Sequence, residues 1–489
     1  MATAPLTVVT QAGPVRGRQA AGCLEFLGIP YADPPAPAHR FDPPRPLSRW
    51  PDAYDATRFG ATATRPPMIA GLVPEPPIPG ANCLNLNVFT PAPGRTGLPV
   101  LVWIHGGAFI TGCNSSPWYH GGRFAADGVV LVAINYRLGA EGFLMTEDGP
   151  ANRGILDMAQ ALRWVQQNIG GFGGDPGRVT IAGQSAGAMA CLALLACPAA
   201  SGTFRHVAAI SPAAPVLAPA EQAGKAAESF CAQLGVPART AELNRVDLAR
   251  RLRVEERYLP PGMSLWPPQP ADQRAASVGM DALSWRPWLD GETLTSGVPD
   301  AIGRADAGGL LIGTTADELN FTLWPTDPPA TREACQKGFG NLGIGPEAIG
   351  RYLAAARSGT WAEALARART DHSFRLPARH LADLSAAAGR DTYVYQFGWR
   401  SPGGLGAAHC LDLPFFFGNL DAPGTAEVLG PEPPAALATV MHGALVNFAR
   451  TGNPGWPAYR LPDRATMIFD RRERVTSDPF DTAMAASVA

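Results

Sequence analysis

The sequence of 489 residues contains no long apolar run, no excess of either charge and no closely paired cysteines. Its longest apolar run, Ala186 to Cys197, falls short of the roughly 18 residues that suggest a membrane-spanning helix. A formal net charge of -2 offers no basic surface to the phosphates of nucleic acids or anionic lipids. We therefore expect no nucleic-acid partner and no stable membrane association, which leaves a small molecule as the favoured partner.

The eight cysteines are dispersed, and they form no CxxC pair and no zinc-finger spacing. This dispersion in a long chain favours free thiols over a disulfide framework or a metal site. The segment from Met1 to Gly17 also lacks the basic start and the apolar stretch of a secretory signal. The sequence therefore predicts a cytoplasmic protein.

Short runs of apolar and β-branched residues alternate with longer helical or loop segments along the chain. Continuous apolar strands of this kind are typical of a buried, mostly parallel sheet, and hence of the α/β class. Between two of them, Ile155 to Ile169 repeats apolar residues at three- and four-residue steps, which predicts a helix. The predicted strands are Pro99 to Ile104, Val129 to Asn135, Val179 to Ala182, Val207 to Ser211, Gly309 to Gly313 and Tyr393 to Phe397.

No internal repeat and no charged or Ser-rich spacer divides the chain, so we expect one catalytic domain over residues 1–489. The segment 212–299 is a large insertion with a predicted helix near Glu221 to Leu234, and it could form a cap over a site. The Pro-rich segment 62–82 and the segment 320–385 are further expected cap insertions.

The strongest local motif is GxSxG at Gly183 to Gly187, which lies between the strand-like RVTIA and the apolar, helix-like AMACLALLA. A serine on a sharp turn from strand to helix exposes its hydroxyl above the sheet, and the flanking glycines let such a turn close. Ser185 would also lie at a helix N-terminus, where free N–H groups favour developing negative charge. The context therefore predicts a nucleophilic serine rather than a simple helix cap.

A serine nucleophile requires donors for the oxyanion, a histidine base and a carboxylate that orients the base. After the strand VLVWI, the segment from His105 to Phe109 is a turn of small residues whose N–H groups could converge on a carbonyl oxygen. Gly107 and Ala108, together with Ala186 after the serine, are the expected oxyanion-hole donors. We expect His105 itself to be structural.

Candidates for the acid and the base follow two later strands. The strand GLLIG is followed closely by Asp317 and Glu318, at the strand end where open α/β sheets place their active sites. We favour Glu318, with Asp317 as the alternative. A Gly-rich loop after the strand YVYQF leads to His409, and the order serine, acid, histidine along the chain favours it as the base. The alternative histidines are His372, His380 and His442.

At this point the sequence resembles the type B carboxylesterases, the family of cholinesterases and bacterial p-nitrobenzyl esterases. The resemblance implies an α/β-hydrolase fold, a triad of Ser185, Glu318 and His409, and an oxyanion hole from Gly107, Ala108 and Ala186. Much of the preference for Glu318 rests on it. The motifs that carry it are FLGIPYADPP, RFDPPRPLSRW, CLNLNVFTP, WIHGGAFITG, NYRLGAEGF, NRGILD through FGGDPGRVTIAGQSAGA, TTADELNF, AAHCLDLPFFFGN and NFARTGNPGWPAY.

Three positions depart from the family pattern. The usual acidic pair before CLNLN is Ala81 and Asn82, which implies the loss of a structural ion pair. The glutamate that often precedes the nucleophile is Gln184, which removes a negative charge beside the predicted base. Cys83 lacks the partner with which secreted relatives form a disulfide, consistent with a reducing compartment.

The predicted activity is hydrolysis of short to medium acyl or aryl esters through an acyl-enzyme, without a metal or an organic cofactor. A hydrolase of carbamates or aryl amides is an alternative, and a non-catalytic binding protein is another. The expected assembly is a monomer or a weak homo-oligomer. Aromatic residues near the motifs are candidates for an apolar pocket or for simple core: Phe109, Phe143, Phe321, Trp324 and Phe415.

Overall fold

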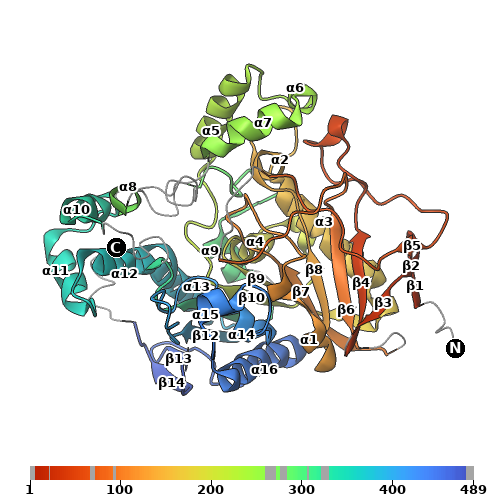
Figure 1. Ribbon diagram of the computed structural model, residues 1–489. Helices are drawn as coiled ribbons and strands as arrows, with labels where there is room; N and C mark the ends of the chain where they lie inside the picture. The colour runs from red at the N-terminus through yellow and green to blue at the C-terminus, as the bar shows by residue number, and fades with distance from the viewer. Residues whose placement is uncertain are drawn as a thin grey trace.

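The computed structural model describes residues 6–20, 22–65, 72–91, 95–258, 271–275, 283–304, 308–320 and 330–480. Its centre is an 11-stranded sheet with the order β14-β13-β12-β11-β10-β9-β7-β8-β6-β4-β3 (Figure 1). The strands are β3 (Arg18–Ala20), β4 (Cys23–Pro30), β6 (Asn85–Thr90), β7 (Leu98–Ile104), β8 (Val130–Ile134), β9 (Gly174–Gln184), β10 (His206–Ile210), β11 (Leu310–Thr315), β12 (Thr392–Phe397), β13 (Ala465–Phe469) and β14 (Arg474–Ser477).

The middle of this sheet is parallel. Strands β8, β7, β9, β10, β11, β12 and β13 pair in parallel, whereas antiparallel pairs form both edges. Each predicted apolar run lies on one of the parallel strands. The prediction of an α/β protein with a mostly parallel central sheet is therefore confirmed.

Side chains of the parallel strands alternate between two apolar layers. Val102 of β7 belongs to a core cluster shared with α3 (Arg153–Asn168) and α4 (Ala186–Leu194). Its neighbour Trp103 belongs to a second cluster on the other face, shared with α16 (Ala435–Thr451). Because both faces are buried, these strands are continuously apolar rather than alternating in sequence.

Helices flank the sheet, and those that the sequence predicted include α3, α4 and α5 (Ala220–Leu234). No helix in the described ranges is long and apolar enough to cross a membrane. The other helices are α1 (Gly122–Ala126), α2 (Gly139–Phe143), α6 (Thr240–Arg245), α7 (Leu248–Glu255), α8 (Ala271–Ala275), α9 (Val298–Arg304), α10 (Arg332–Asn341), α11 (Pro346–Ala355), α12 (Trp361–Thr370), α13 (Leu376–Ala387), α14 (Leu413–Phe417) and α15 (Thr425–Leu429), with a π-helical segment, η8 (Asp371–Arg375), between α12 and α13.

The two large insertions form two groups of helices beside the sheet (Figure 1), and these groups meet where α8 of the first packs against α10 of the second. Helices α5, α6 and α7 of the 212–299 segment lie together at the top of Figure 1. Helices α10, α11 and α12 of the 320–385 segment lie at the left and share a small core of their own around Phe339, Tyr352 and Leu365. Each group therefore packs internally as well as against the rest of the chain.

Several short strands were not predicted from the sequence. Strands β1 (Thr7–Thr10), β2 (Gly13–Arg16) and β5 (Tyr54–Asp55) form a small separate sheet. The antiparallel strands β3, β4, β6 and β14 and the parallel strand β13 extend the large sheet at its edges. Most of these strands are short. The buried strands β4 and β6 contain polar residues such as Glu25, Asn85 and Asn87, so they lack the continuous apolar pattern of the central strands.

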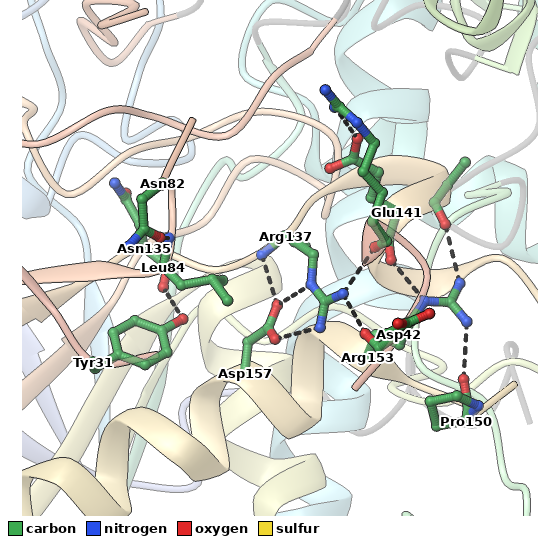
Figure 2. A network of polar contacts seen from close by, with 12 residues as sticks. Tyr31, Asp42, Asn82, Leu84, Asn135, Arg137, Glu141, Pro150, Arg153 and Asp157 are labelled. Atoms are coloured by element: carbon green, nitrogen blue, oxygen red, sulfur yellow. Dashed lines mark hydrogen bonds and ion pairs between the residues drawn. The ribbon is translucent and has the colours of Figure 1, made fainter. Parts of the chain in front are cut away.

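A buried ionic network fixes the loop between β8 and α2 (Figure 2). Nε of Arg137 donates to Oδ2 of Asp157 at 2.8 Å, and its Nη2 donates to Oδ1 at 2.6 Å. The Nη1 atom donates to the carbonyl oxygens of Arg40 and Asp42. Because an unpaired buried charge is strongly destabilising, these bonds hold the loop in one position. The N–H of Gly139 in turn donates to the carbonyl of Phe109 at 2.7 Å, so the loop supports the segment that follows β7.

Candidate active site

Ser185 lies on a sharp turn between β9 and α4. Its backbone has φ 55° and ψ -123°, an unfavourable conformation for a residue with a side chain, and such strain is characteristic of functional sites. Its own N–H donates to the carbonyl of Ile210 at 2.9 Å, which ties the turn to the neighbouring strand. The predicted strand, serine, helix arrangement is therefore present.

The glycines on either side of the serine are required by close backbone approaches. A Cβ on Gly183 would lie 2.5 Å from the carbonyl carbon of Gly187, and a Cβ on Gly187 would lie 2.1 Å from the carbonyl oxygen of Ile104. Side chains at these positions would push α4 away from the end of β7. The two glycines thus bring the serine next to the loop that follows β7.

That loop contains the predicted oxyanion-hole residues. Gly107, Ala108 and Phe109 have consecutive positive φ angles of 103°, 54° and 61°. A Cβ on Gly106 would lie 3.2 Å from Cβ of Ser185, so the loop passes directly beside the serine. Ala186 is the first residue of α4, where an N–H has no partner within the helix. Among the described residues, the N–H groups of Gly107 and Ala108 donate no hydrogen bond.

Side chains from distant parts of the chain hold the loop in this shape. The carboxylate of Glu75 accepts hydrogen bonds from the hydroxyl of Thr111 and, at 3.0 Å, from the N–H of Gly112. Arg65 forms an ion pair with the same oxygen. The sequence analysis missed this role of Glu75, because a lone acid in a Pro-rich stretch carries no signal of a contact more than thirty residues away.

His105 has the structural role that was expected. Its ring lies 4.5 Å from that of Tyr136 in a stacked arrangement, and Nδ1 lies 2.8 Å from the carbonyl oxygen of Gly106. Burial lowers the pKa of His105 to about 4, so the ring is neutral at neutral pH. His105 therefore supports the turn as an uncharged side chain.

His409 and Glu318 form a direct pair. Nδ1 of His409 lies 2.5 Å from Oε2 of Glu318, and the N–H of His409 donates to the carbonyl of Glu318 at 3.2 Å. The other carboxylate oxygen, Oε1, accepts the N–H of Thr315 at 2.7 Å. Glu318 is wholly buried, whereas 8% of the surface of His409 is exposed to solvent. The loops after β11 and β12 thus bring together the acid and the base that the sequence favoured.

The alternative acid points elsewhere. Oδ2 of Asp317 forms an ion pair with Arg400 and accepts the N–H of Ala407 at 2.9 Å. Asp317 therefore holds the loop that leads to His409, and it is Glu318 that contacts the imidazole.

The alternative histidines also lie in other settings. His442, on α16, lies 3.0 Å from Oδ2 of Asp127 and 2.8 Å from the carbonyl of Phe416. His380 is exposed on α13, and His372 is half-buried on the η8 segment. The described contacts pair none of the three with Glu318.

Gln184 contacts the predicted base. Its Nε2 lies 3.0 Å from Nε2 of His409. When Nδ1–H of a neutral imidazole donates to Glu318, Nε2 is an acceptor, so the amide can donate to it. The glutamine amide thus contacts the ring nitrogen on the side of the imidazole away from the carboxylate.

A second carboxyl is buried near the pair. Asp412 is fully buried, and one of its oxygens accepts the hydroxyl of Tyr395 at 3.2 Å. Burial, followed by the charge of Glu318, raises the pKa of Asp412 to about 7. Below that pH the Asp412 carboxyl is protonated, so it adds no negative charge beside Glu318. The sequence motif contained this residue, but nothing in the motif indicated its protonation.

The candidate pocket aromatics separate into two groups. The rings of Phe109 and Phe143 lie 4.8 Å apart in the core cluster next to the oxyanion loop. Phe415 lies in the other cluster, packed against Trp399 at 5.3 Å. Phe321 and Trp324 lie outside the described residues. Of the three described aromatics, Phe109 and Phe143 therefore adjoin the loop beside Ser185.

No group of three His, Cys, Asp or Glu side chains in the described part of the chain comes together as metal ligands. The eight cysteines are free thiols, and all except Cys410 are buried. The groups that the described structure brings together at this site are a serine hydroxyl, an imidazole paired with a carboxylate and backbone N–H groups.

Comparison with known proteins gives consistent matches along the chain. Residues 4–477 match the model of the carboxylesterase family. The para-nitrobenzyl esterase of Bacillus subtilis is 36% identical, over 96% of each chain. The phenmedipham hydrolase of Pseudarthrobacter oxydans is 33% identical over 96% of this chain and 95% of its own, and mouse cholinesterase is 29% identical over 95% and 83%.

Solved structures agree with these sequence matches. A carboxylesterase of Geobacillus stearothermophilus superposes with a TM-score of 0.84 at 36% identity, over 99% of this chain and 100% of that one. A p-nitrobenzyl esterase superposes with a TM-score of 0.81 at 34% identity, over 99% of both chains.

Proposed function

This chain belongs to the carboxylesterase family, and from that premise we propose that it hydrolyses carboxylic esters through Ser185, His409 and Glu318. The observation that carries the proposal is the 2.5 Å contact between His409 and Glu318, together with a strained Ser185 at the start of α4. The fold supports the same conclusion, since the predicted α/β-hydrolase fold is confirmed by the solved carboxylesterases.

In the first step, Nε2 of His409 accepts the proton of the Ser185 hydroxyl as its oxygen attacks the ester carbonyl carbon. Glu318 accepts Nδ1–H, which fixes the tautomer and stabilises the imidazolium that forms. The carbonyl oxygen becomes an oxyanion, and the N–H groups of Gly107, Ala108 and Ala186 are proposed to bind it. Each such donor contributes about 10² to 10³ in rate.

The tetrahedral intermediate then collapses to an acyl-enzyme. His409 gives its proton to the departing alcohol, and the acyl group remains bonded to the Ser185 oxygen. A water molecule, deprotonated by the same imidazole, attacks the acyl carbon and releases the carboxylic acid. The cycle restores the serine and the neutral histidine without a metal or an organic cofactor.

We propose short to medium acyl or aryl esters as substrates, with slower turnover of aryl carbamates. The names of two relatives support this choice, one a para-nitrobenzyl esterase and the other a phenmedipham hydrolase. The alternative of a non-catalytic binding protein is disfavoured, because the positions of the serine, acid and base are all filled.

We further propose one catalytic domain with cap insertions at 62–82, 212–299 and 320–385. A contact that supports it is the carboxylate of Glu255 on α7, which accepts the N–H of Ala140 and so ties the 212–299 insertion to helix α2. We also propose a monomer or weak homo-oligomer that works in the cytoplasm, because free thiols are typical of reducing compartments.

Hydrolysis of a series of p-nitrophenyl esters, from acetate to palmitate, tests the proposed activity. A p-nitrophenyl carbamate and an anilide complete the series. We expect the highest kcat/KM on short or medium acyl chains, and a loss in Ser185→Ala on the order of 10⁶. Equal activity of the two proteins would contradict the role of Ser185.

A further inference from the structure

A cavity of about 210 Å³ lies behind the loop that carries Glu318, and arginine dominates its charged lining. It is separate from the residues of the candidate active site, although Ala316 and Asp317 form part of its wall. Four arginines and two aspartates line it: Arg357, Arg367, Arg375, Arg400, Asp317 and Asp371.

The positive charges exceed the negative ones by two. Arg400 pairs with Asp317, and Arg375 pairs with Asp371. Among the described residues, neither Arg357 nor Arg367 forms an ion pair with a carboxylate. Two guanidinium groups in the wall are therefore not neutralised by contact with an acid.

The acid on the same helix as Arg367 does not supply the missing partner. Oε1 of Glu363 accepts the N–H of Arg357 at 3.0 Å, and Oε2 accepts the N–H of Ser358 at 2.7 Å and the hydroxyl of Ser358. These bonds direct the carboxylate at the backbone that precedes α12. Its charge lies close enough to interact with that of Arg367, but the described contacts include no ion pair between the two side chains.

Two donors in the wall also lack an acceptor. Nε of Arg367 and Nε of Arg375 are buried and have no hydrogen-bond partner among the residues that the structure describes. A buried donor without an acceptor is costly, and a bound anion would remove that cost. The guanidinium of Arg375 additionally lies 5.8 Å from the centre of the Phe480 ring, which closes one side of the cavity.

The same arginines hold the loops of the candidate active site. Nη2 of Arg375 donates to the carbonyl of Ala316 at 2.7 Å, two residues before Glu318. Arg400 pairs with Asp317, whose carboxylate also accepts the N–H of Ala407, two residues before His409. An anion that draws either guanidinium into the cavity would act directly on the loops that position the acid and the base.

We propose that this cavity is an effector site for a phosphate dianion, either free or as a small phosphate monoester. Guanidinium groups bind phosphate through paired hydrogen bonds, and the excess of two positive charges matches a dianion. The volume suits a compact anion, because sites for larger organic ligands occupy roughly 300 Å³ or more. Binding involves no covalent step and changes ester hydrolysis through the Ala316 and Asp317 contacts.

Calorimetric titration of the full chain with sodium phosphate tests the site, with ionic strength held constant by sodium chloride. We expect saturable binding to the wild type, and binding at least about tenfold weaker in Arg367→Gln. Arg357→Gln is a second variant, since neither arginine is part of an ion pair. The matched control is Arg253→Gln, an exposed arginine on α7 outside the cavity, which should bind phosphate as the wild type does.

Titrations with methyl phosphate and with acetate identify which anion the cavity binds. Tighter binding of methyl phosphate than of phosphate would identify a monoester as the ligand, whereas the reverse would identify the free ion; both support the site. Acetate should bind far more weakly, and equal binding of acetate would overturn selectivity for a dianion. Saturable heat that is unchanged in Arg367→Gln and Arg357→Gln, or no saturable heat in any protein, would overturn the site.

The rate of ester hydrolysis shows whether the bound anion acts as an effector, so this claim rests on the proposed function. Saturating phosphate should change kcat/KM of the wild type roughly fivefold and leave Arg367→Gln unaffected. Binding without any kinetic change would overturn the effector role. Because calorimetry needs no turnover, failure of the phosphate site remains distinguishable from failure of the proposed esterase activity.

Discussion

Nε2 of Gln184 lies 3.0 Å from Nε2 of His409, the nitrogen that must accept the proton of Ser185 in the proposed mechanism. An amide that donates to this nitrogen stabilises the neutral imidazole and competes with the serine hydroxyl for it. A carboxylate at the same position would instead stabilise the imidazolium. The residue before the nucleophile therefore contacts the ring nitrogen that must take the serine proton.

Gln184→Glu should move the acid limb of the pH profile of kcat/KM to higher pH. The reason is that a negative charge beside the ring favours its protonated form, which cannot accept the serine proton. The profile is measured on a p-nitrophenyl ester between pH 5 and 9. Gln233→Glu, the same change at an exposed position on α5, is the control, and identical profiles for all three proteins would contradict the assigned contact.

Glu318→Gln should lower kcat by about 10⁴, because the amide cannot hold the imidazole in the required tautomer or stabilise its charge. Asp317→Asn is the matched comparison, since it removes a neighbouring carboxylate that contacts Arg400 rather than His409. We expect Asp317→Asn to lower the temperature of thermal unfolding and to reduce kcat much less than Glu318→Gln does. Steady-state kinetics and thermal unfolding of both variants provide the measurement, and a larger kinetic loss in Asp317→Asn would exchange the two roles.

Gly107→Ala should reduce kcat by about 10² to 10³ with a smaller change in KM. The new Cβ would lie 2.3 Å from the carbonyl oxygen of Thr111, so the loop must shift and its N–H groups would leave the position of the oxyanion. Gly97→Ala is a suitable control, because Gly97 also has a positive φ, 77°, but apart from its chain neighbours none of the described residues has an atom within 4 Å of the added Cβ. Comparable kinetic losses in both variants would argue against an oxyanion role for Gly107.

Glu255→Gln should flatten the dependence of stability on pH between about 4.5 and 7. Burial raises the pKa of Glu255 from 4.5 to about 7, so in this window the folded chain keeps a proton that the unfolded chain loses. Folded stability therefore falls as pH rises, by up to about 1.4 kcal/mol per pH unit from this group, and levels off above about 7.

Urea unfolding at several pH values measures this contribution. The glutamine can still accept the N–H of Ala140, so the hydrogen bond between α2 and α7 remains. Glu256→Gln, the adjacent exposed residue, serves as the control and should leave the slope as in the wild type. The account of Glu255 is wrong if its variant retains the full slope.

The sequence predicted those parts of the fold and the site whose signals are local. Ser185 follows from the GxSxG turn, because glycines are needed within the same few residues. The central strands follow from continuous apolar runs. The choice of Glu318 over Asp317 depends on which carboxylate turns toward His409, and two adjacent acids carry no local sign of that direction.

The remaining features depend on contacts between distant segments. Glu75 reaches the oxyanion loop from a Pro-rich stretch, and the cavity arginines come from several separate segments. The edge strands depend on pairing with neighbours that the sequence does not specify. Such features arise from packing and burial in the folded chain, so composition and periodicity could not predict them.

The most direct test of the central claim is the reaction of the protein with a fluorophosphonate ester, followed by peptide mapping of the adduct by mass spectrometry. The account predicts one phosphonyl group per chain on Ser185, no adduct at that position in Ser185→Ala, and labelling at least about a hundredfold slower in Glu318→Gln. An adduct on another residue, or equal labelling of the wild type and Ser185→Ala, would contradict the assignment of Ser185 as the nucleophile.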